Sequence, residues 1–308
     1  MPRVRFAISI PQFYADGTFD PGGFRAYLAR AEGLGFDSAW TQEQILGTMP
    51  HLGPIEIMTY AAACTERLRL GCAVFVSTLH SPVHLAKSLS TLDQLSRGRL
   101  EVGLGGGGRR MFSAFAVDPE KPIARFIEGL QVMKALWTEP RVNFEGQYWQ
   151  LANAAMEPKP FQKPCPPIWF GGSHPAALRR AVRYGDGFFG AGSQPTAQFA
   201  SQVQIVREAL AESGRSDSGF RIAKRVYIAV DDEAGRARQR VAEALEKLYG
   251  SFGMHGMESV AVFGRPDECV KGLTEVADAG AELIQLNPLF DEAEQMERLV
   301  AEVIPHLS

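Results

Sequence analysis

The sequence predicts an α/β protein with the architecture of a (β/α)8 TIM barrel with insertions, and three observations carry this prediction. Eight short apolar segments that suit buried parallel strands alternate with helical patterns along the chain. The length of 308 residues is typical of such a barrel built as one domain. Residues 67–110 show the repeating unit most clearly, because a strand, a loop, a helix, a tight turn and a second strand run there into a glycine-rich loop.

The strands are expected where short apolar runs are bounded by polar residues, glycine or proline. The expected strands are Arg5–Ile10, Phe36–Trp40, Leu68–Val76, Leu100–Leu104, Ile168–Phe170, Gly187–Gly190, Phe220–Val230 and Leu283–Leu286.

The helices are expected where apolar residues recur three and four positions apart, as Leu85, Leu89 and Leu92 do. Gly98 follows that helix and suits the left-handed backbone with which many helices end. The expected helices are Gly22–Leu34, Glu56–Thr65, Pro82–Leu95, Ile123–Thr138, Pro175–Tyr184, Thr196–Ser213, Glu233–Tyr249, Pro266–Ala279 and Asp291–Leu307.

Two segments interrupt this alternation. Residues 139–167 contain a predicted hairpin, Val142–Trp149, that turns at Glu145-Gly146, and five prolines follow it by Pro167. Residues 250–265 are predicted to be a loop that contains glycine and methionine. Because strand–helix alternation resumes after each segment, we expect both to be excursions from a single domain that covers residues 1–308.

Composition excludes several classes of partner. A net charge of −3 and a pI of about 6.1 argue against nucleic acid or an anionic membrane surface. No apolar run approaches the ~20 residues needed to span a bilayer, and the amino-terminal residues are predicted to form a strand rather than a signal segment. The four cysteines are scattered without C-x-x-C spacing, which favours buried thiols in a reducing cytoplasm.

A glycine run follows the fourth strand. Gly103-Leu-Gly105-Gly106-Gly107-Gly108 satisfies G-x-G-x-x-G, but a dinucleotide-binding loop should follow the first strand of its unit and should be followed by an acidic residue that ends the next strand. Here Glu128 lies within a helix, so we reject that interpretation, and the missing Gly-Lys-Ser/Thr excludes a Walker A loop. Two interpretations remain: a backbone that a flat ring can approach closely, and a flexible surface loop.

Gly171-Gly172-Ser173 joins the fifth strand to a helix and is a candidate anion site. Ser173 is expected near the N-cap of that helix and Pro175 near its first position. Free backbone N–H groups at a helix start can hold a phosphate. An ordinary helix cap, without any ligand, explains the same residues.

No side-chain set of a self-sufficient enzyme or a metal site is evident. His80 and His84 are four residues apart, but Pro82 lies between them and no nearby carboxylate completes a metal site. Nucleophile-elbow and H-E-x-x-H signatures are missing. An enzyme of this kind borrows its chemistry from an organic cofactor. Trp40, at the end of the second strand, either packs in the core or forms a wall of the cofactor pocket.

Several phrases, spread over most of the first 190 residues, together resemble the luciferase-like monooxygenase family, whose members are flavin- or F420-dependent (β/α)8 oxidoreductases. These phrases are Gly35-Phe-Asp-Ser-Ala-Trp40, Leu85-Ala-Lys-Ser-Leu-Ser-Thr-Leu-Asp-Gln-Leu-Ser-Arg-Gly-Arg99, Met156-Glu-Pro-Lys-Pro160, Pro167-Ile-Trp-Phe-Gly-Gly172 and Ala181-Val-Arg-Tyr-Gly-Asp-Gly187.

The resemblance implies where the cofactor binds. A non-prolyl cis peptide behind the central ring is expected at Ala73-Val74, or within a residue or two of it. The loop that contains Gly105, Gly106 and Gly107 is expected beside the cofactor. The turn of Gly171, Gly172 and Ser173 is expected to hold its phosphate, and Trp40 to lie at the same pocket.

One pair departs from the family pattern. Many F420-dependent members have an acid followed by a histidine after the second strand, where this chain has Glu43-Gln44. The resemblance places both residues at the cofactor and makes Gln44 the candidate catalytic residue, although glutamine cannot donate a proton as an imidazolium does. Arg109 and Arg110 either meet an anionic cofactor tail or substrate, or are solvated surface residues.

The resemblance therefore implies hydride transfer between coenzyme F420 and a small-molecule substrate. The alternatives are a monooxygenase that uses reduced FMN from a separate reductase, and a catalytically silent barrel that binds a flavin-like ligand or only partners. A cytoplasmic homodimer is also expected by resemblance. Neither a metal, nor nucleic acid, nor a membrane is an expected partner.

Overall fold

The structure, a computed structural model, describes residues 4–14, 17–215 and 219–307. In this part of the chain eight parallel strands follow one another in the order β1-β2-β3-β4-β7-β8-β9-β11, and β11 pairs with β1 to close the barrel. The predicted (β/α)8 barrel is confirmed. Its strands are β1 (Arg5–Ser9), β2 (Ser38–Thr41), β3 (Arg69–Val76), β4 (Leu100–Gly105), β7 (Ile168–Gly171), β8 (Gly187–Gly190), β9 (Arg221–Val230) and β11 (Leu283–Pro288).

The helices lie close to their predicted bounds, and three of them have the predicted bounds. They are α1 (Pro21–Gly33), α2 (Pro54–Cys64), α3 (Pro82–Leu95), α4 (Pro122–Thr138), α5 (Pro175–Tyr184), α6 (Thr196–Ser213), α7 (Ala234–Tyr249), α8 (Pro266–Asp278) and α9 (Glu292–Arg298). Gly98 has φ +82°, which confirms the left-handed backbone expected after α3. None of the described helices is both long and apolar enough to cross a membrane.

Two predicted segments differ from the structure. The loop at residues 250–265 contains an additional short strand, β10 (Val262–Gly264), which pairs in parallel with β9. The predicted closing helix Asp291–Leu307 is wrong beyond Arg298, because α9 gives way to a π-helical turn (Leu299–Val303) and a 3-10 turn (Ile304–His306). Pro305 has no N–H and therefore cannot continue an α-helical ladder.

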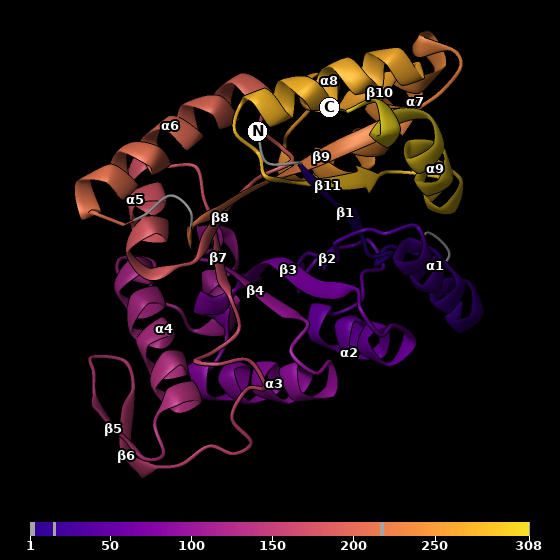
Figure 1. Cartoon of the computed structure of the whole chain (residues 1–308). Coiled ribbons are helices and arrows are strands. Elements are labelled where there is room, and N and C mark those ends of the chain that lie inside the picture. Colours follow the sequence, from indigo (N-terminus) through magenta and orange to yellow (C-terminus); the bar gives the residue numbers. More distant parts are fainter. Residues whose placement is uncertain (1–3, 15–16, 216–218, 308) are drawn as a thin grey trace. The chain divides into compact units, whose positions relative to one another are not determined.

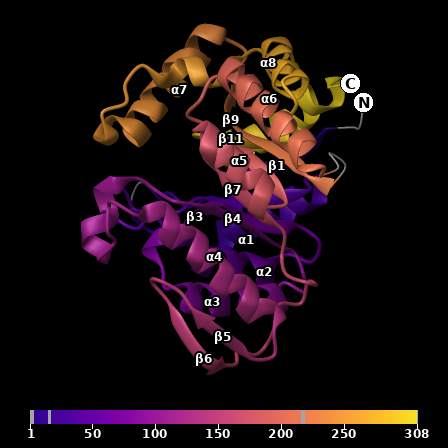
Figure 2. The same cartoon turned by 90° about the vertical axis from the view of Figure 1, so that its left-hand side faces the viewer.

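The chain divides into two compact units, which are described separately. The first contains Met1–Pro11, Ala26–Trp40 and Gly171–Ser308, and the second contains Gln12–Arg25 and Thr41–Phe170. In the second unit the β5–β6 hairpin lies beyond α3 and α4, away from β3 and β4, in both views (Figure 1 and Figure 2). That residues 1–308 form one domain stays a prediction.

The excursion after α4 is held by side chains of two helices. The hairpin consists of β5 (Val142–Glu145) and β6 (Gln150–Ala154), so its second strand begins later than predicted. Glu128 of α4 accepts hydrogen bonds from the N–H groups of the turn at residues 147–149, at 2.7–2.9 Å. The proline-rich stretch that follows binds α3, where Asp93 accepts from both the N–H and the side-chain amide of Gln162 at 2.8 Å.

The first glycine of the run packs against the neighbouring strand. A Cβ on Gly103 would lie 2.1 Å from the carbonyl oxygen of Cys72 in β3, which is closer than real Cβ atoms approach. Gly108, the last glycine of the run, lies outside the strand and has φ −97° and no neighbour within 4 Å of a built Cβ. Close contact between β3 and β4 therefore requires glycine at position 103 but not at position 108.

We expect Gly103→Ala to lower the free energy of unfolding by about 2–3 kcal/mol, because the added methyl group overpacks backbone that cannot move aside. Gly108→Ala, the matched control, should change it by less than about 0.5 kcal/mol. Urea unfolding followed by circular dichroism measures both. Equal stabilities for the two variants would contradict this account of the strand contact.

Candidate functional site

The carboxylate of Glu43, just after β2, binds the loop that follows β3. Its Oε2 accepts the backbone N–H of Val76 at 2.7 Å, and Nε2 of His80 lies 2.9 Å from Oε1. The Glu43 side chain is only 3% exposed, and that of His80 is 24% exposed. The carboxyl ends of two neighbouring barrel strands are thus joined at the edge where barrels of this type carry their chemistry.

The same loop is joined to the glycine run after β4. The hydroxyl of the buried Thr78 donates to the carbonyl oxygen of Gly106 at 2.8 Å. Arg125, in the first turn of α4, donates from Nε to the carbonyl oxygen of Thr78 at 3.3 Å, and its guanidinium lies 4.7 Å from the ring centre of Trp149. Glu43, Thr78 and Arg125 therefore hold three successive loops of the second unit together.

Gln12 binds the backbone of the loop after β2, next to Glu43. Its side-chain amide donates to the carbonyl oxygens of Gln42 and Leu52, both at 3.0 Å, and accepts the N–H of Gln42 at 2.7 Å. The Gln12 side chain is buried, so these bonds satisfy polar groups that water does not reach. Gln12 thus holds both the N–H and the carbonyl oxygen of Gln42, the residue before Glu43.

The strand β3 is irregular at the expected position. The peptide bond between Ala73 and Val74 is cis, which confirms the predicted site, and the pairing with β4 shifts register between Cys72 and Phe75. That the central ring of the cofactor lies against Ala73 and Val74 stays a prediction.

The glycines of the run have different surroundings. A Cβ on Gly105 would lie 2.5 Å from Cγ2 of Val74, and one on Gly107, where φ is +67°, would lie 2.2 Å from Cγ1 of Val76. A Cβ on Gly106 would meet only the tip of Ile123, at 4.0 Å. Packing against β3 therefore accounts for Gly105 and Gly107. It does not account for Gly106 or Gly108, where an added Cβ would have space.

Two side chains in the loop after β3 have unused hydrogen-bonding capacity. The hydroxyl of Ser77 is buried and has no hydrogen-bond partner in the described chain. Nδ1 of His80 has none there either, because the ring binds Glu43 through Nε2. Buried polar groups are normally paired, so the lone Ser77 hydroxyl points to a group that the protein itself does not supply.

The turn after β7 lies in the first unit. Ser173 precedes the N-cap, which is His174: its Nδ1 accepts the N–H of Ala176 at 3.2 Å, and Pro175 is the first helical residue as predicted. The N–H groups of Gly172, Ser173 and His174 make no hydrogen bond within the described residues. Gly172 has φ +143° and lies exposed, so these donors are open to an anion.

The other predicted residues are placed as follows. Trp40 is 1% exposed and packs on Phe189 with ring centres 4.6 Å apart, which is a core role; its contact with a cofactor stays a prediction. Gln44 is half-buried. Its side chain lies against Gly47, because a Cβ built on Gly47 would be only 2.1 Å from Nε2 of Gln44. Arg109 and Arg110 are exposed at the start of a 3-10 turn.

Comparison with known proteins identifies the family. A model of the luciferase-like monooxygenases matches residues 5–255. The chain belongs to the luciferase-like monooxygenase family. It is 32% identical to a phthiodiolone/phenolphthiodiolone dimycocerosates ketoreductase of Mycobacterium sp. (strain JLS) over 63% of this chain and 51% of that protein, and so spans about half of that relative.

Two further members match over almost their whole length. An F420-dependent glucose-6-phosphate dehydrogenase of Kineococcus radiotolerans is 26% identical, with 94% of each chain covered. The crystal structure of the monooxygenase RslO1 from Streptomyces bottropensis superposes with a TM-score of 0.82 at 26% identity and covers 99% of this chain and 100% of that one.

His80 is a titratable residue of the candidate site that sequence reasoning missed. Its carboxylate partner lies 37 positions earlier, so no local spacing indicates the pair. The signal that could have revealed it is topological: Glu43 and His80 follow adjacent parallel strands, whose ends meet at one edge of the barrel. The prediction that no metal binds here stays untested, although the described residues contain no cluster of three His, Cys, Asp or Glu side chains that could hold one.

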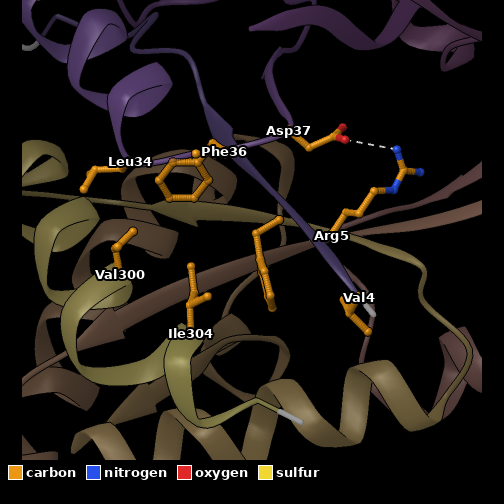
Figure 3. Close-up of a pocket in the computed structure, with 9 residues that line it drawn as sticks. Val4, Arg5, Leu34, Phe36, Asp37, Val300 and Ile304 are labelled. Atoms are coloured by element: carbon orange, nitrogen blue, oxygen red, sulfur yellow. Dashed lines mark hydrogen bonds and ion pairs between the residues drawn. The ribbon is translucent and has the colours of Figure 1, made fainter. Parts of the chain in front are cut away.

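The first unit contains a cavity of its own (Figure 3). It has a volume of about 420 Å³ and is lined by residues at the start of β1, just before β2, and by Val300 and Ile304. Arg5 and Asp37 form an ion pair at 3.1 Å on its wall. Because it lies at the amino ends of the strands, where this fold does not place catalysis, it is not the candidate site.

A buried lysine holds the loop after β8. Nζ of Lys224 donates to the carbonyl oxygens of Ala191 and Gln194, at 3.0 and 2.9 Å. The side chain is 1% exposed. Burial, together with the neighbouring charge of Arg225, lowers the pKa of Lys224 to about 8.

This pKa predicts a pH-dependent stability. From about pH 8 up to about pH 10.4, the ordinary lysine value, the unfolded chain binds more protons at Lys224 than the folded chain, so the folded state gains stability as pH rises. Between about pH 8 and 9.5 we expect the wild type to gain roughly 1–2 kcal/mol relative to Lys224→Met. Lys271→Met, at an exposed position, is the control. A wild-type advantage over Lys224→Met that does not change with pH would contradict the lowered pKa.

Proposed function

We propose that this protein is an F420-dependent oxidoreductase that transfers hydride between the deazaflavin and a small organic substrate. The observation that carries the proposal is the similarity over 94% of both chains to an F420-dependent glucose-6-phosphate dehydrogenase. The cofactor, when bound, accepts or donates the hydride. The protein supplies binding, orientation and proton handling.

The residues present fit such a cofactor. The unpaired N–H groups of Gly172, Ser173 and His174 suit a phosphate, which F420 and FMN both carry. The open space at Gly106 and the unpaired hydroxyl of Ser77 suit the edge of a polar ring system. In this proposal Ala73, Val74, Glu43 and Gln44 line the same ring.

The substrate is proposed to carry an apolar part. Ile45 and Leu46, which directly follow Gln44, are 40% and 53% exposed, and Ile123 beside Gly106 is 44% exposed. Exposed apolar side chains beside polar groups are typical of a small-molecule site. We propose further that the enzyme acts in the cytoplasm as a homodimer.

A second candidate is an FMN-dependent monooxygenase that receives reduced FMN from a separate reductase. The similarity to the monooxygenase RslO1 over 99% of this chain favours it. A third candidate, a catalytically silent barrel, is favoured by glutamine at position 44, where many F420-dependent members have histidine.

Titration of the purified protein with F420 and with FMN, followed by fluorescence, separates these candidates. We expect F420 to bind at least about tenfold more tightly than FMN, a difference of about 1.4 kcal/mol. Binding of FMN alone would contradict the proposal. Binding of F420 without turnover of any alcohol, aldehyde or ketone in a substrate panel would favour the silent barrel.

A further inference from the structure

The imidazole of His80 is fixed by a carboxylate that is itself fixed by the backbone. Glu43 accepts the N–H of Val76 at 2.7 Å through Oε2, and its two oxygens lie 2.9 and 3.1 Å from Nε2 of His80. Val76 ends β3 and His80 follows the short 3-10 turn Ser77–Leu79. The contact with Glu43 therefore orients the imidazole through Nε2.

This contact determines which ring nitrogen carries the proton. An ionised carboxylate only accepts hydrogen bonds, so Nε2 of His80 must be the donor and carry hydrogen. Nδ1 is then the basic nitrogen of the neutral ring, and within residues 4–14, 17–215 and 219–307 it makes no hydrogen bond. A histidine held in this way can take up a proton at Nδ1 while the carboxylate stabilises the resulting positive charge, as in carboxylate–histidine pairs of hydrolases.

The pair lies beside the loop that carries Gly106. Thr78, two residues before His80, donates to the carbonyl oxygen of Gly106, where a built Cβ would meet only the tip of Ile123 at 4.0 Å. The unpaired hydroxyl of Ser77 lies in the same short loop. By contrast, the Gln44 side chain is turned against Gly47, and an amide neither gains nor loses a proton near neutral pH.

We propose that His80 is the acid–base residue of this protein and that Glu43 is its positioning residue, an inference that rests on the proposed F420-dependent activity. In alcohol oxidation the carbinol C–H bond breaks and its electron pair leaves with the hydrogen to the oxidised deazaflavin. The hydroxyl proton passes to Nδ1 of His80 and a C=O bond forms. In carbonyl reduction the hydride comes from the reduced deazaflavin, and Nδ1 returns the proton to the oxygen.

The test compares His80→Ala with His84→Ala, a matched control because His84 is exposed on α3 and its side chain is not part of the site. The assay uses oxidised F420 with propan-2-ol, cyclohexanol or glucose 6-phosphate, whichever the wild type oxidises. We expect kcat of His80→Ala to fall about 10²–10⁴-fold while the dissociation constant of F420, measured by fluorescence, stays close to the wild-type value. His84→Ala should match the wild type.

Added imidazole distinguishes proton transfer from a structural role. It should restore part of the kcat of His80→Ala and leave His84→Ala unchanged, because free imidazole can replace the missing acid–base group but cannot repair a misfolded loop. Glu43→Gln should also lower kcat, and its defect should not respond to imidazole. Wild-type kcat in His80→Ala, or a loss that imidazole does not reverse, would overturn this inference alone.

A measurement without substrate checks the pair directly. In ¹⁵N NMR spectra of the wild type without cofactor, the neutral His80 ring should carry its hydrogen on Nε2 in one dominant tautomer, and Glu43→Gln should remove that preference. A mixture of tautomers in the wild type would overturn the assignment of Glu43. A wild type that neither binds F420 nor oxidises any of the three alcohols would instead overturn the proposed function, and this inference with it.

Discussion

A carboxyl group as buried as that of Glu43 needs hydrogen-bond donors that replace the water it has lost. Here the donors are the Val76 N–H and the imidazole of His80, both in the loop after the neighbouring strand. One side chain thus fixes the ends of β2 and β3 relative to each other. The hydrogen bond from Thr78 to Gly106 extends this arrangement to the end of β4. The loops of the candidate site depend on that buried carboxyl group.

The other features of the second unit support this arrangement. Gln12 binds the backbone beside Glu43, and Arg125 holds the carbonyl oxygen of Thr78. Glycine at positions 103, 105 and 107 lets β4 and the loop after it lie close to β3. Groups of this unit that remain open include the space at Gly106, the hydroxyl of Ser77 and Nδ1 of His80. A rigid frame with a few unsatisfied polar groups is what a cofactor enzyme needs, because the cofactor brings the reactive atom and the protein orients it.

The fold could be derived from the sequence almost in full, because its signals are local. Apolar spacing and Pro82 define α3 to the residue, and short apolar runs define the eight barrel strands. Where the prediction was wrong, the element is very short or depends on a contact that is distant in sequence. The strand β10 exists only because β9 lies beside it, and its three residues carry no pattern of their own.

The candidate site was harder to predict for the same reason. The glycine run indicated a close backbone approach, but sequence alone could not separate packing against Val74 and Val76 from space for a ligand at Gly106. The family resemblance located the irregular peptide at Ala73-Val74 and drew attention to Glu43. It also directed the search for an acid–base group to Gln44, whereas the imidazole that meets Glu43 comes from the next strand's loop.

A crystal structure of the protein grown with F420 would test the central claim most directly. The account predicts that the deazaflavin ring lies against Gly106, that the Ser77 hydroxyl donates to it, and that Glu43 still binds Nε2 of His80 while Nδ1 faces the ligand. A ring bound away from Gly106, or a His80 side chain turned so that Nδ1 meets another protein group, would contradict it.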